Sequence, residues 1–246
     1  MTLTEQEVLR YSRHIILPEI GGRGQVRIKE SVVLVAGLGA AGSAAALYLA
    51  AAGVGRMTLW DPANVTLPDF TSSIAHIRAH IGRNRAESAR TKLLGINPDT
   101  AVTVSTDPDA LAALVPAHQI VVATAGDWKA IQEAALRSGT AVVFAGVHEA
   151  EGAVFSYRPG EPCLGCIDPA VAAQAGLQPE GADGAGRVVS AAGGVIGTAA
   201  ATEALKLIVG IGSPLTGRVM CYDGWTARFR EVRVTRRPDC PVCARD

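Results

Sequence analysis

The sequence of 246 residues has no net charge and few aromatic residues. Lys plus Arg and Asp plus Glu number 23 each, and aromatic residues make up only 4% of the chain. A neutral chain argues against broad electrostatic binding to nucleic acid or to an anionic membrane. Hydrophobic residues make up 48%, which excludes a disordered chain. The 27 glycines follow no three-residue period, which excludes collagen. We therefore expect a folded protein whose partners include neither nucleic acid nor membrane.

A secretory signal is also lacking. The first seven residues carry Glu5 and Glu7 where a signal peptide has a basic region, so a cytoplasmic location is expected. Residues 32–55 carry no charge and are long enough for a membrane helix. This stretch opens with valines, is interrupted by three glycines and then becomes rich in alanine. That order favours a buried strand, a glycine turn and a buried helix over a membrane span.

Strand patterns alternate with helix patterns along the first part of the chain. We expect strands at 31–36, 56–61, 101–105, 119–123 and 140–145, and helices at 3–11, 41–52, 87–96, 109–115 and 129–138. The segment with Pro18, Gly21, Gly22 and Gly24 is interpreted as a loop. Such alternation predicts an α/β fold, with a Rossmann-like, mostly parallel sheet and helices on both faces.

The second part of the chain has a different pattern. A strand at 152–157 and a hairpin of 218–222 with 227–234, around Asp223-Gly224, predict antiparallel strands that extend the sheet. A helix is expected at 195–209, and residues 172–187 are interpreted as a long mobile loop. No linker separates two parts, so residues 1–246 are interpreted as a single domain. It comprises an N-terminal helix and arm (1–30) and two halves (31–146 and 147–246).

A glycine motif lies between the expected strand 31–36 and the helix that follows. Gly37, Gly39 and Gly42 fit G-x-G-x-x-G. In this motif the first glycine makes the turn, the second admits a phosphate and the third lets helix and strand pack closely. Asp61 lies at the end of the next strand, where a carboxylate can accept the ribose hydroxyls. The pattern predicts a nucleotide site in the half 31–146 and does not distinguish ATP from NAD. A purely structural glycine turn is the alternative.

Four cysteines form two pairs of the type that holds zinc. Cys163 and Cys166, and Cys240 and Cys243, are CxxC pairs that together can supply a closed, structural Cys₄ zinc site. Such a metal would attach the end of the chain to its middle, in the half 147–246. A redox dithiol is the alternative. The fifth cysteine, Cys221, is interpreted as a small buried hydrophobic residue.

Together these motifs resemble the ThiF/MoeB/HesA family, the bacterial relatives of ubiquitin-activating E1 enzymes. The resemblance covers about residues 6–243. Besides the glycine turn, Asp61 and the cysteine pairs, it rests on short segments: RYSRHI at 10–15, ESA at 87–89, INP at 96–98, AGGVIG at 192–197, EALK at 203–206, YDG at 222–224 and FRE at 229–231.

The resemblance implies a reaction and its participants. Members of the family bind ATP and Mg²⁺ and adenylate a carboxylate, usually at the C-terminus of a ubiquitin-like sulfur carrier, with release of pyrophosphate. They are typically homodimers in which an N-terminal arginine, Arg13 here, reaches the nucleotide of the partner. The glycines bind the phosphates, Asp61 binds the ribose, and the four cysteines bind structural zinc.

Several positions depart from the family pattern near the implied phosphates. The family has a second acidic residue where this chain has Ala63, an asparagine where it has Asp69, and a phosphate-binding arginine where it has Ser72. Asp69 is therefore acidic where the triphosphate is implied to lie. Basic residues that could compensate are Arg78, Arg83 and Lys92, although solvent-exposed helix charges are the simpler interpretation.

The implied catalytic groups are also altered. The catalytic lysine of the family is Arg85 here, which keeps the charge on a planar fork. The magnesium-binding aspartate falls on Gly126, and a shift of one residue assigns that role to Asp127. No cysteine lies between residues 167 and 220, so a covalent sulfur step in that segment is not expected.

Three functions are left open. The first is an ATP-dependent adenylyltransferase that activates a sulfur-carrier C-terminus or a small carboxylic acid. The second is a catalytically impaired E1-like paralogue that acts as a binding scaffold or partner subunit, suggested by Ala63, Ser72 and Gly126. The third is an enzyme that has changed to NAD. His76 and His80 are interpreted as surface polar residues rather than metal ligands.

Overall fold

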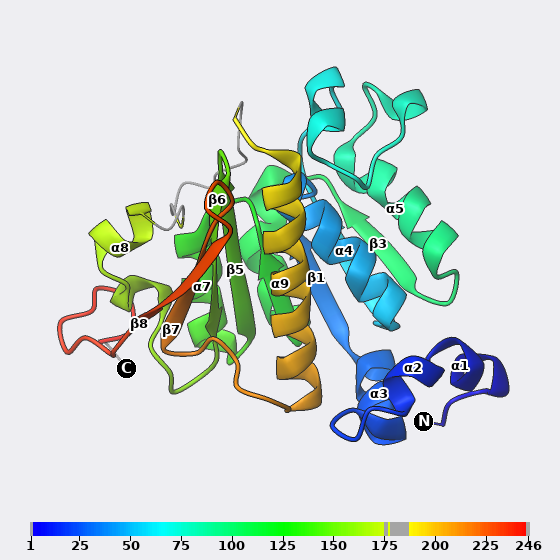
Figure 1. The fold of residues 1–246 in the computed structure, drawn as a ribbon, viewed down its shortest axis with the longest axis horizontal. Helices are drawn as coiled ribbons and strands as arrows, with labels where there is room; N and C mark the ends of the chain where they lie inside the picture. Colours follow the sequence, from blue (N-terminus) through cyan, green and yellow to red (C-terminus); the bar gives the residue numbers. More distant parts are fainter. Residues whose placement is uncertain (1, 175–176, 178–186, 245–246) are drawn as a thin grey trace.

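The computed structural model describes residues 2–174, 177 and 187–244, and its centre is one eight-stranded sheet (Figure 1). Within these residues the strand order is β3-β2-β1-β4-β5-β6-β7-β8. The strands from β3 to β5 are parallel, and β6, β7 and β8 continue the sheet in antiparallel pairing. The strands are β1 (Val32–Ala36), β2 (Arg56–Trp60), β3 (Ala101–Ser105), β4 (Ile120–Ala123), β5 (Ala141–His148), β6 (Glu151–Tyr157), β7 (Arg218–Asp223) and β8 (Arg228–Arg233).

Helices precede, connect and cover these strands. The α-helices are α1 (Glu5–Arg10), α2 (Ser12–Ile15), α3 (Gly21–Glu30), α4 (Ala40–Ala52), α5 (Arg85–Ile96), α6 (Leu111–Leu114), α7 (Trp128–Ser138), α8 (Pro169–Gln174) and α9 (Ser190–Val209). Short 3₁₀ helices are η1 (Leu67–Thr71), η2 (Arg78–His80), η3 (Pro108–Ala110), η4 (Val115–Ala117) and η5 (Leu164–Cys166).

Each face of the sheet packs against its own hydrophobic core. On β1, Val33 and Val35 join the core formed with α4, α5 and α9, whereas Leu34 and Ala36 join the core formed with α7. Successive side chains of a strand point to opposite faces, so a strand covered on both faces is an uninterrupted apolar run. This confirms the predicted α/β sheet with helices on both faces and antiparallel strands at one end.

Helix α9 is held close to α4 by glycines. A Cβ added to Gly193 would lie 2.5 Å from the Cβ of Ala40, and one added to Gly197 would lie 2.1 Å from the carbonyl oxygen of Ala41. Helix α9 is long and apolar enough to cross a membrane by length and composition alone, but 56% of its most apolar 18-residue window is buried inside the protein. It is therefore a core helix, which packs against β5 and β6 and lies between β5 and β1 in Figure 1.

The N-terminal segment differs from the sequence prediction. Residues 21–30, expected as part of a loop, form α3 despite three glycines. Tertiary contacts explain the helix: Gly24 lies against Ile20 and Val209, and the Gln25 side-chain amide donates a 2.8 Å hydrogen bond to the Ala52 carbonyl. Packing against the ends of α4 and α9 thus outweighs the low helix propensity of glycine.

The interpreted loop at 172–187 is described only in part. Its first residues belong to α8, which the sequence pattern did not predict. Leu177 is buried, and Arg187 lies 3.6 Å from the Glu149 carboxylate. The remaining residues of the segment, 175–176 and 178–186, lie outside the described residues.

Candidate nucleotide site and cysteine cluster

The glycine turn lies at the carboxyl end of β1, where the sheet changes direction. From β1 the chain passes through α4 to β2 on one side, while β4 pairs with the other side of β1. Open α/β sheets bind ligands in the crevice at such a switch point. The Thr124 hydroxyl, at the end of β4, donates 3.0 and 3.1 Å hydrogen bonds to the carbonyls of Ala36 and Gly37. The predicted strand–turn–helix therefore occupies the expected place in the fold.

The three glycines have the spatial roles that the motif predicts. Gly37 has a φ of 92°, and a Cβ there would lie 2.5 Å from the Cβ of Ala125. A Cβ on Gly42 would lie 1.9 Å from the Gly37 carbonyl oxygen. At Gly39 an added Cβ would have no atom of the described residues within 4 Å, so these residues leave the space in front of it open. Among the described residues no side chain caps the N-terminus of α4, whose backbone N–H groups can bind a phosphate there.

Asp61 follows β2 and is buried beside this turn. Its Oδ2 accepts a 2.8 Å hydrogen bond from the Leu38 N–H, and its Oδ1 accepts a 2.9 Å hydrogen bond from the Ala63 N–H. Burial raises the pKa of this carboxyl above its usual value, although the two N–H donors act in the opposite direction. In this structure the Asp61 carboxylate thus stabilises the glycine turn through its hydrogen bond to the Leu38 N–H. Its role toward a ribose stays a prediction.

An ion pair between Asp69 and Arg85 lies next to Asp61. Arg85 is the first residue of α5, and its Nη2 donates a 2.7 Å and its Nε a 3.3 Å hydrogen bond to the two oxygens of Asp69. The Asn84 side chain, at the N-terminus of α5, donates a 2.7 Å hydrogen bond from its Nδ2 to the Asp61 carbonyl oxygen. Asp69 also accepts hydrogen bonds from the N–H (2.7 Å) and hydroxyl (3.1 Å) of Thr66. The guanidinium expected to face phosphates is therefore paired with a carboxylate of its own chain.

His76 and His80 are buried, so their interpretation as surface residues was wrong. They are 5% and 7% exposed. The Nε2 of His76 lies 3.0 Å from the Leu38 carbonyl, which can only accept, so this nitrogen carries the proton. Its Nδ1 is buried without a hydrogen-bond partner in the described part of the chain. His80 bonds the Ser88 hydroxyl at 3.1 Å. Spacing alone could not reveal this burial, because the segment 72–84 has no regular period.

The predicted magnesium position is occupied by a glycine that the fold requires. Gly126 has a φ of 89°, and a Cβ there would lie 2.3 Å from the Leu111 Cδ2. The positive φ disfavours an aspartate at this position, whereas the Leu111 Cδ2 is the end of a flexible side chain that can move. Asp127 is exposed and caps α7 through a 3.0 Å hydrogen bond that its Oδ1 accepts from the Ala130 N–H. Ser72 ends η1 and is partly buried. The catalytic assignment of Asp127 stays a prediction.

Arg13 lies at the opposite end of the domain from the glycine turn. It is an exposed residue of α2, two residues after Tyr11, which is the N-cap of that helix. The Tyr11 hydroxyl accepts a 2.9 Å hydrogen bond from Asn97, and the ring packs against Gly53, which ends α4. The 13 residues of α4 separate its two ends by about 20 Å. Arg13 is therefore remote from the glycine turn of its own chain (Figure 1).

The four cysteines of the two CxxC pairs form one buried cluster. Their sulfur atoms all lie within 4.8 Å of one another, and individual distances are 3.9 Å (Cys163–Cys166), 3.6 Å (Cys163–Cys240) and 3.5 Å (Cys166–Cys243). A tetrahedral site with metal–sulfur bonds of 2.3 Å places sulfurs about 3.8 Å apart. Burial alone raises the pKa of a thiol, but backbone N–H groups lower the pKa of Cys240 to about 7. The donor set fits a metal ion.

Comparisons with known proteins agree with this architecture. The chain matches the model of the ThiF family over residues 11–242. It is 39% identical over 253 residues to the molybdopterin-synthase adenylyltransferase of Escherichia coli (strain K12), with 98% of each chain covered. It is 37% identical to the mouse adenylyltransferase and sulfurtransferase MOCS3, covering 98% of this chain and 54% of that protein. The crystal structure of E. coli MccB with succinimide has a TM-score of 0.80 at 19% identity. The match covers 95% of this chain and 74% of the MccB chain.

The fold and the site define an E1-like protein: a Rossmann-type sheet with a glycine turn, extended by antiparallel strands beside a four-cysteine cluster. The chain belongs to the ThiF family, as the match over most of its length and the identity to its relatives show.

Proposed function

We propose that this protein is an ATP-dependent adenylyltransferase that activates the C-terminal carboxylate of a ubiquitin-like sulfur carrier or of another small acid. The observation that carries the proposal is the glycine turn, which leaves open space at Gly39 in front of the uncapped N-terminus of α4. Relatives at 39% and 37% identity, which this chain matches over 98% of its own length, are named adenylyltransferases.

The reaction requires little covalent chemistry from the protein. A carboxylate oxygen attacks the α-phosphorus of ATP, and the bond to the leaving pyrophosphate breaks. The chain must hold the two reactants in line and stabilise the charge that develops on the phosphates. The N–H groups of α4 and the guanidinium of Arg85 are suited to the phosphates, and Asp61 to the ribose. Mg²⁺ would neutralise phosphate charge, with the Asp127 carboxylate as its proposed ligand.

We assign structural zinc to the cysteine cluster. Four buried thiolates enclose an ion completely, which leaves no position for water or substrate. The ion would join η5 to the chain end and so fix the antiparallel part of the sheet. This part then offers a rigid surface for a carrier protein beside the nucleotide site.

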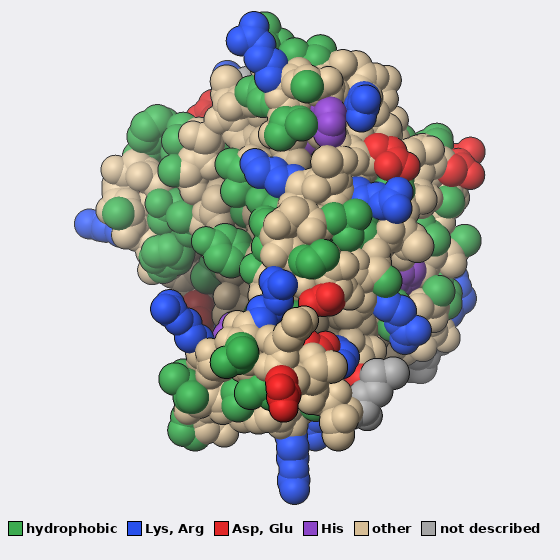
Figure 2. Space-filling view, turned by 90° about the vertical axis from the view of Figure 1, so that its right-hand side faces the viewer, with side chains coloured by type: hydrophobic (Ala, Val, Ile, Leu, Met, Phe, Trp, Pro, Cys, Tyr) green, Lys and Arg blue, Asp and Glu red, His purple; other side chains and the backbone are tan. Residues whose placement is uncertain are grey.

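We further propose a homodimer, because Arg13 can serve a nucleotide site only in another subunit. Large apolar side chains are exposed on α1 and α2, where Leu9 is 76% and Ile16 is 75% exposed, and again at Ile74, which is 50% exposed. Figure 2 shows hydrophobic side chains spread over the side of the molecule that faces the viewer, some of them at the lower end, where α1–α3 lie. A second copy would cover such side chains. Light scattering after size exclusion gives the mass, and mixing Arg13→Ala with Gly39→Ala subunits tests activity in trans.

The proposed activity is tested by binding and by turnover. Calorimetry of the zinc-loaded protein with ATP and Mg²⁺ measures nucleotide affinity, with NAD as the control ligand. Release of pyrophosphate is then measured with carriers that end in Gly-Gly and with small acids. Micromolar ATP binding and carrier-dependent pyrophosphate support the proposal. NAD binding in place of ATP overturns the reaction class.

A second candidate function is a catalytically impaired E1-like subunit that acts as a scaffold. The Asp69–Arg85 ion pair favours it, because the pair removes a cation from the phosphates. Gly126 adds to it, since its positive φ disfavours an aspartate there. Calorimetry that detects binding of neither ATP nor NAD, together with copurification of a carrier or an active homologue, would establish this function instead.

A further inference from the structure

His76 is a buried, titratable side chain that the proposed adenylation chemistry does not use. It lies in the segment between η1 and η2 and is 5% exposed. The Lys92 ammonium of α5 donates a hydrogen bond to the Ile74 carbonyl, which holds this segment close to α5. The imidazole is thereby kept beside the glycine turn, and its two nitrogens differ in what they contact.

Three buried side chains fix the orientation of Leu38 in the middle of that turn. The Leu38 N–H donates a 2.8 Å hydrogen bond to the Asp61 carboxylate. The Leu38 carbonyl accepts hydrogen bonds from the Ser43 hydroxyl at 2.8 Å and from the His76 Nε2 at 3.0 Å. A carbonyl oxygen has two lone pairs, so both are used. His76 therefore ties a third part of the chain to the turn, in addition to α4 and the end of β2.

The orientation of the Leu38 carbonyl determines where the Gly39 N–H points. The peptide bond between these residues is planar and trans, so its C=O and N–H point in opposite directions. The carbonyl points to Ser43 and His76, and the Gly39 N–H therefore points away from them. This N–H donates no hydrogen bond to any residue that the structure describes. Because Gly39 is the N-cap of α4, its N–H lies beside the unpaired N–H groups that begin the helix.

The second ring nitrogen of His76 favours the neutral imidazole. Nδ1 is buried without a hydrogen-bond partner in the described part of the chain, so a proton added there finds no acceptor. Burial lowers the pKa of the ring most strongly, and the charges of Arg85 and Lys92 on α5 act in the same direction. The bond to Leu38 and the Asp69 carboxylate of η1 oppose them. Protonation therefore favours conformations in which the ring leaves the Leu38 carbonyl.

We infer that His76 is a positioning residue of the nucleotide site: its neutral ring holds the Leu38 carbonyl and thereby directs the Gly39 N–H toward a phosphate. Protonation of the ring releases the carbonyl, so nucleotide affinity is lost as pH falls and the ring takes up its proton. The inference rests on the proposed function, because it takes the glycine turn as the phosphate site. It adds to that function a side chain through which pH controls the affinity.

Two variants of His76 separate its hydrogen bond from its charge. His76→Gln has an amide N–H that can take the place of the Nε2 donor and that does not titrate, whereas His76→Leu has no donor. His118→Gln is the matched control. His118 is also buried, with a pKa that burial lowers, but its ring contacts Leu114 and Thr58 and it precedes β4, away from the turn. Calorimetry measures the affinity for ATP with Mg²⁺ and for adenosine at about pH 7.5 and about pH 5.

The inference requires a specific set of affinities. At about pH 7.5, His76→Leu should bind ATP about three- to tenfold more weakly, the scale of one hydrogen bond, with adenosine affinity unchanged. His76→Gln and His118→Gln should keep the affinity of the unchanged protein. At about pH 5 the unchanged protein should bind ATP more weakly than His76→Gln does, a comparison in which the titration of ATP itself cancels. Unchanged ATP affinity in His76→Leu, an equal loss for adenosine, or a pH dependence that His76→Gln shares would overturn the inference.

Amide hydrogen exchange tests the hold of His76 on the turn without any nucleotide. Residues 36–43 should exchange several-fold faster in His76→Leu and at the unchanged rate in His76→Gln. Equal exchange in all three proteins would overturn the inference. This measurement also separates the inference from the proposed function: if the unchanged protein binds no ATP, the adenylation proposal fails, while the exchange rates still decide whether His76 fixes the turn.

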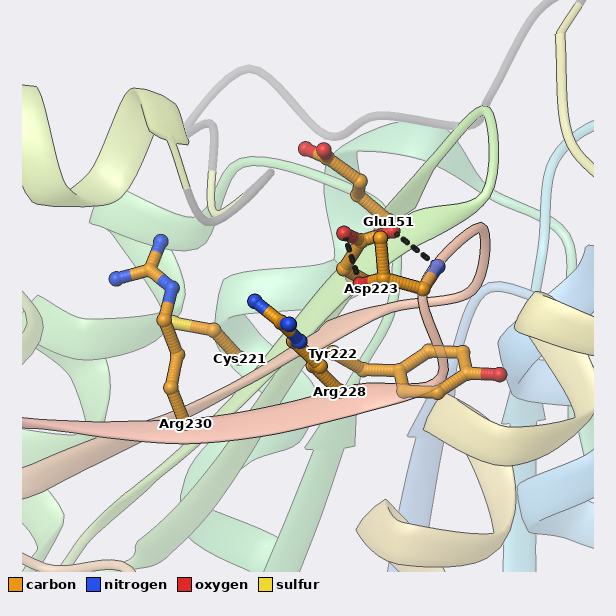
Figure 3. Close-up of a pocket in the computed structure, with 8 residues that line it drawn as sticks. Glu151, Cys221, Tyr222, Asp223, Arg228 and Arg230 are labelled. Atoms are coloured by element: carbon orange, nitrogen blue, oxygen red, sulfur yellow. Dashed lines mark hydrogen bonds between the residues drawn. The ribbon is translucent and has the colours of Figure 1, made fainter.

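A second group of cations provides a control for the place where ATP binds. Figure 3 shows a cavity at the β6–β8 end of the sheet that is lined in part by Arg228 and Arg230 of β8. The double change Arg228→Gln/Arg230→Gln removes both guanidinium groups and should leave ATP affinity unchanged. A loss as large as that in His76→Leu would place the phosphates in this cavity and overturn the inference.

Discussion

The Asp69–Arg85 ion pair makes the change Asp69→Asn the most informative perturbation of the nucleotide site. In the structure Arg85 must exchange the Asp69 carboxylate for a phosphate before it can bind ATP. The side chains are 18% (Arg85) and 10% (Asp69) exposed, so water screens the pair only weakly. A hydrogen bond to a charged group contributes about 1.5–3 kcal/mol. Releasing Arg85 should therefore tighten the binding of ATP with Mg²⁺ about ten- to hundredfold.

The same change should lower the free energy of unfolding. It removes one charge of a largely buried pair, although an asparagine oxygen can still accept from the N–H of Thr66. We expect a loss of about 1–3 kcal/mol, measured by urea unfolding.

Calorimetry measures the affinity for ATP with Mg²⁺, and adenosine serves as the control ligand. Adenosine has no phosphate, so its affinity should not change in Asp69→Asn. Glu87→Gln is the control variant, because it also removes a negative charge from this region but lies exposed on α5, 3.8 Å from Arg90. ATP affinity that stays unchanged or falls in Asp69→Asn would show that the ion pair does not compete with the phosphates, and the reasoning would be wrong.

Three further predictions concern the turn, the metal and pH. Gly42→Ala should destabilise the protein by about 2–4 kcal/mol, since its Cβ would lie 1.9 Å from the Gly37 carbonyl oxygen. Gly39→Ala meets no atom of the described part of the chain, so it should change stability by less than about 1 kcal/mol yet weaken ATP binding in calorimetry. Cys240→Ser should remove zinc, measured by elemental analysis, and lower Tm by roughly 10 °C; retention of one zinc per chain would contradict the site. Burial lowers the pKa of His76 below 6.5, so its contribution to stability is present above that pH and is lost as pH falls toward its folded pKa. Urea unfolding at about pH 5 and about pH 7.5 should show this loss in the unchanged protein and a smaller one in His76→Asn.

The sequence determined the features that depend on local pattern. The apolar run from Val32 to Ala36, the three glycines and the following alanine-rich stretch predicted β1, the turn and α4, because strand periodicity and glycine placement are local properties. The hairpin of β7 and β8 followed from its strand patterns and its Asp-Gly turn. The pairing of the two CxxC segments followed from their chemistry, since thiolates with this spacing share a metal.

Only the tertiary structure decided which charged and polar groups are free to act. Residues 69 and 85 are far apart in sequence, and nothing local indicates that Asp69 binds Arg85 rather than leaving it for a phosphate. The glycine-rich segment of α3 is helical because α4 and α9 pack against it, and His76 is buried because the loop that carries it closes over the Leu38 carbonyl. Local sequence therefore set the elements, while long-range packing and competition among charges set the chemistry of the sites.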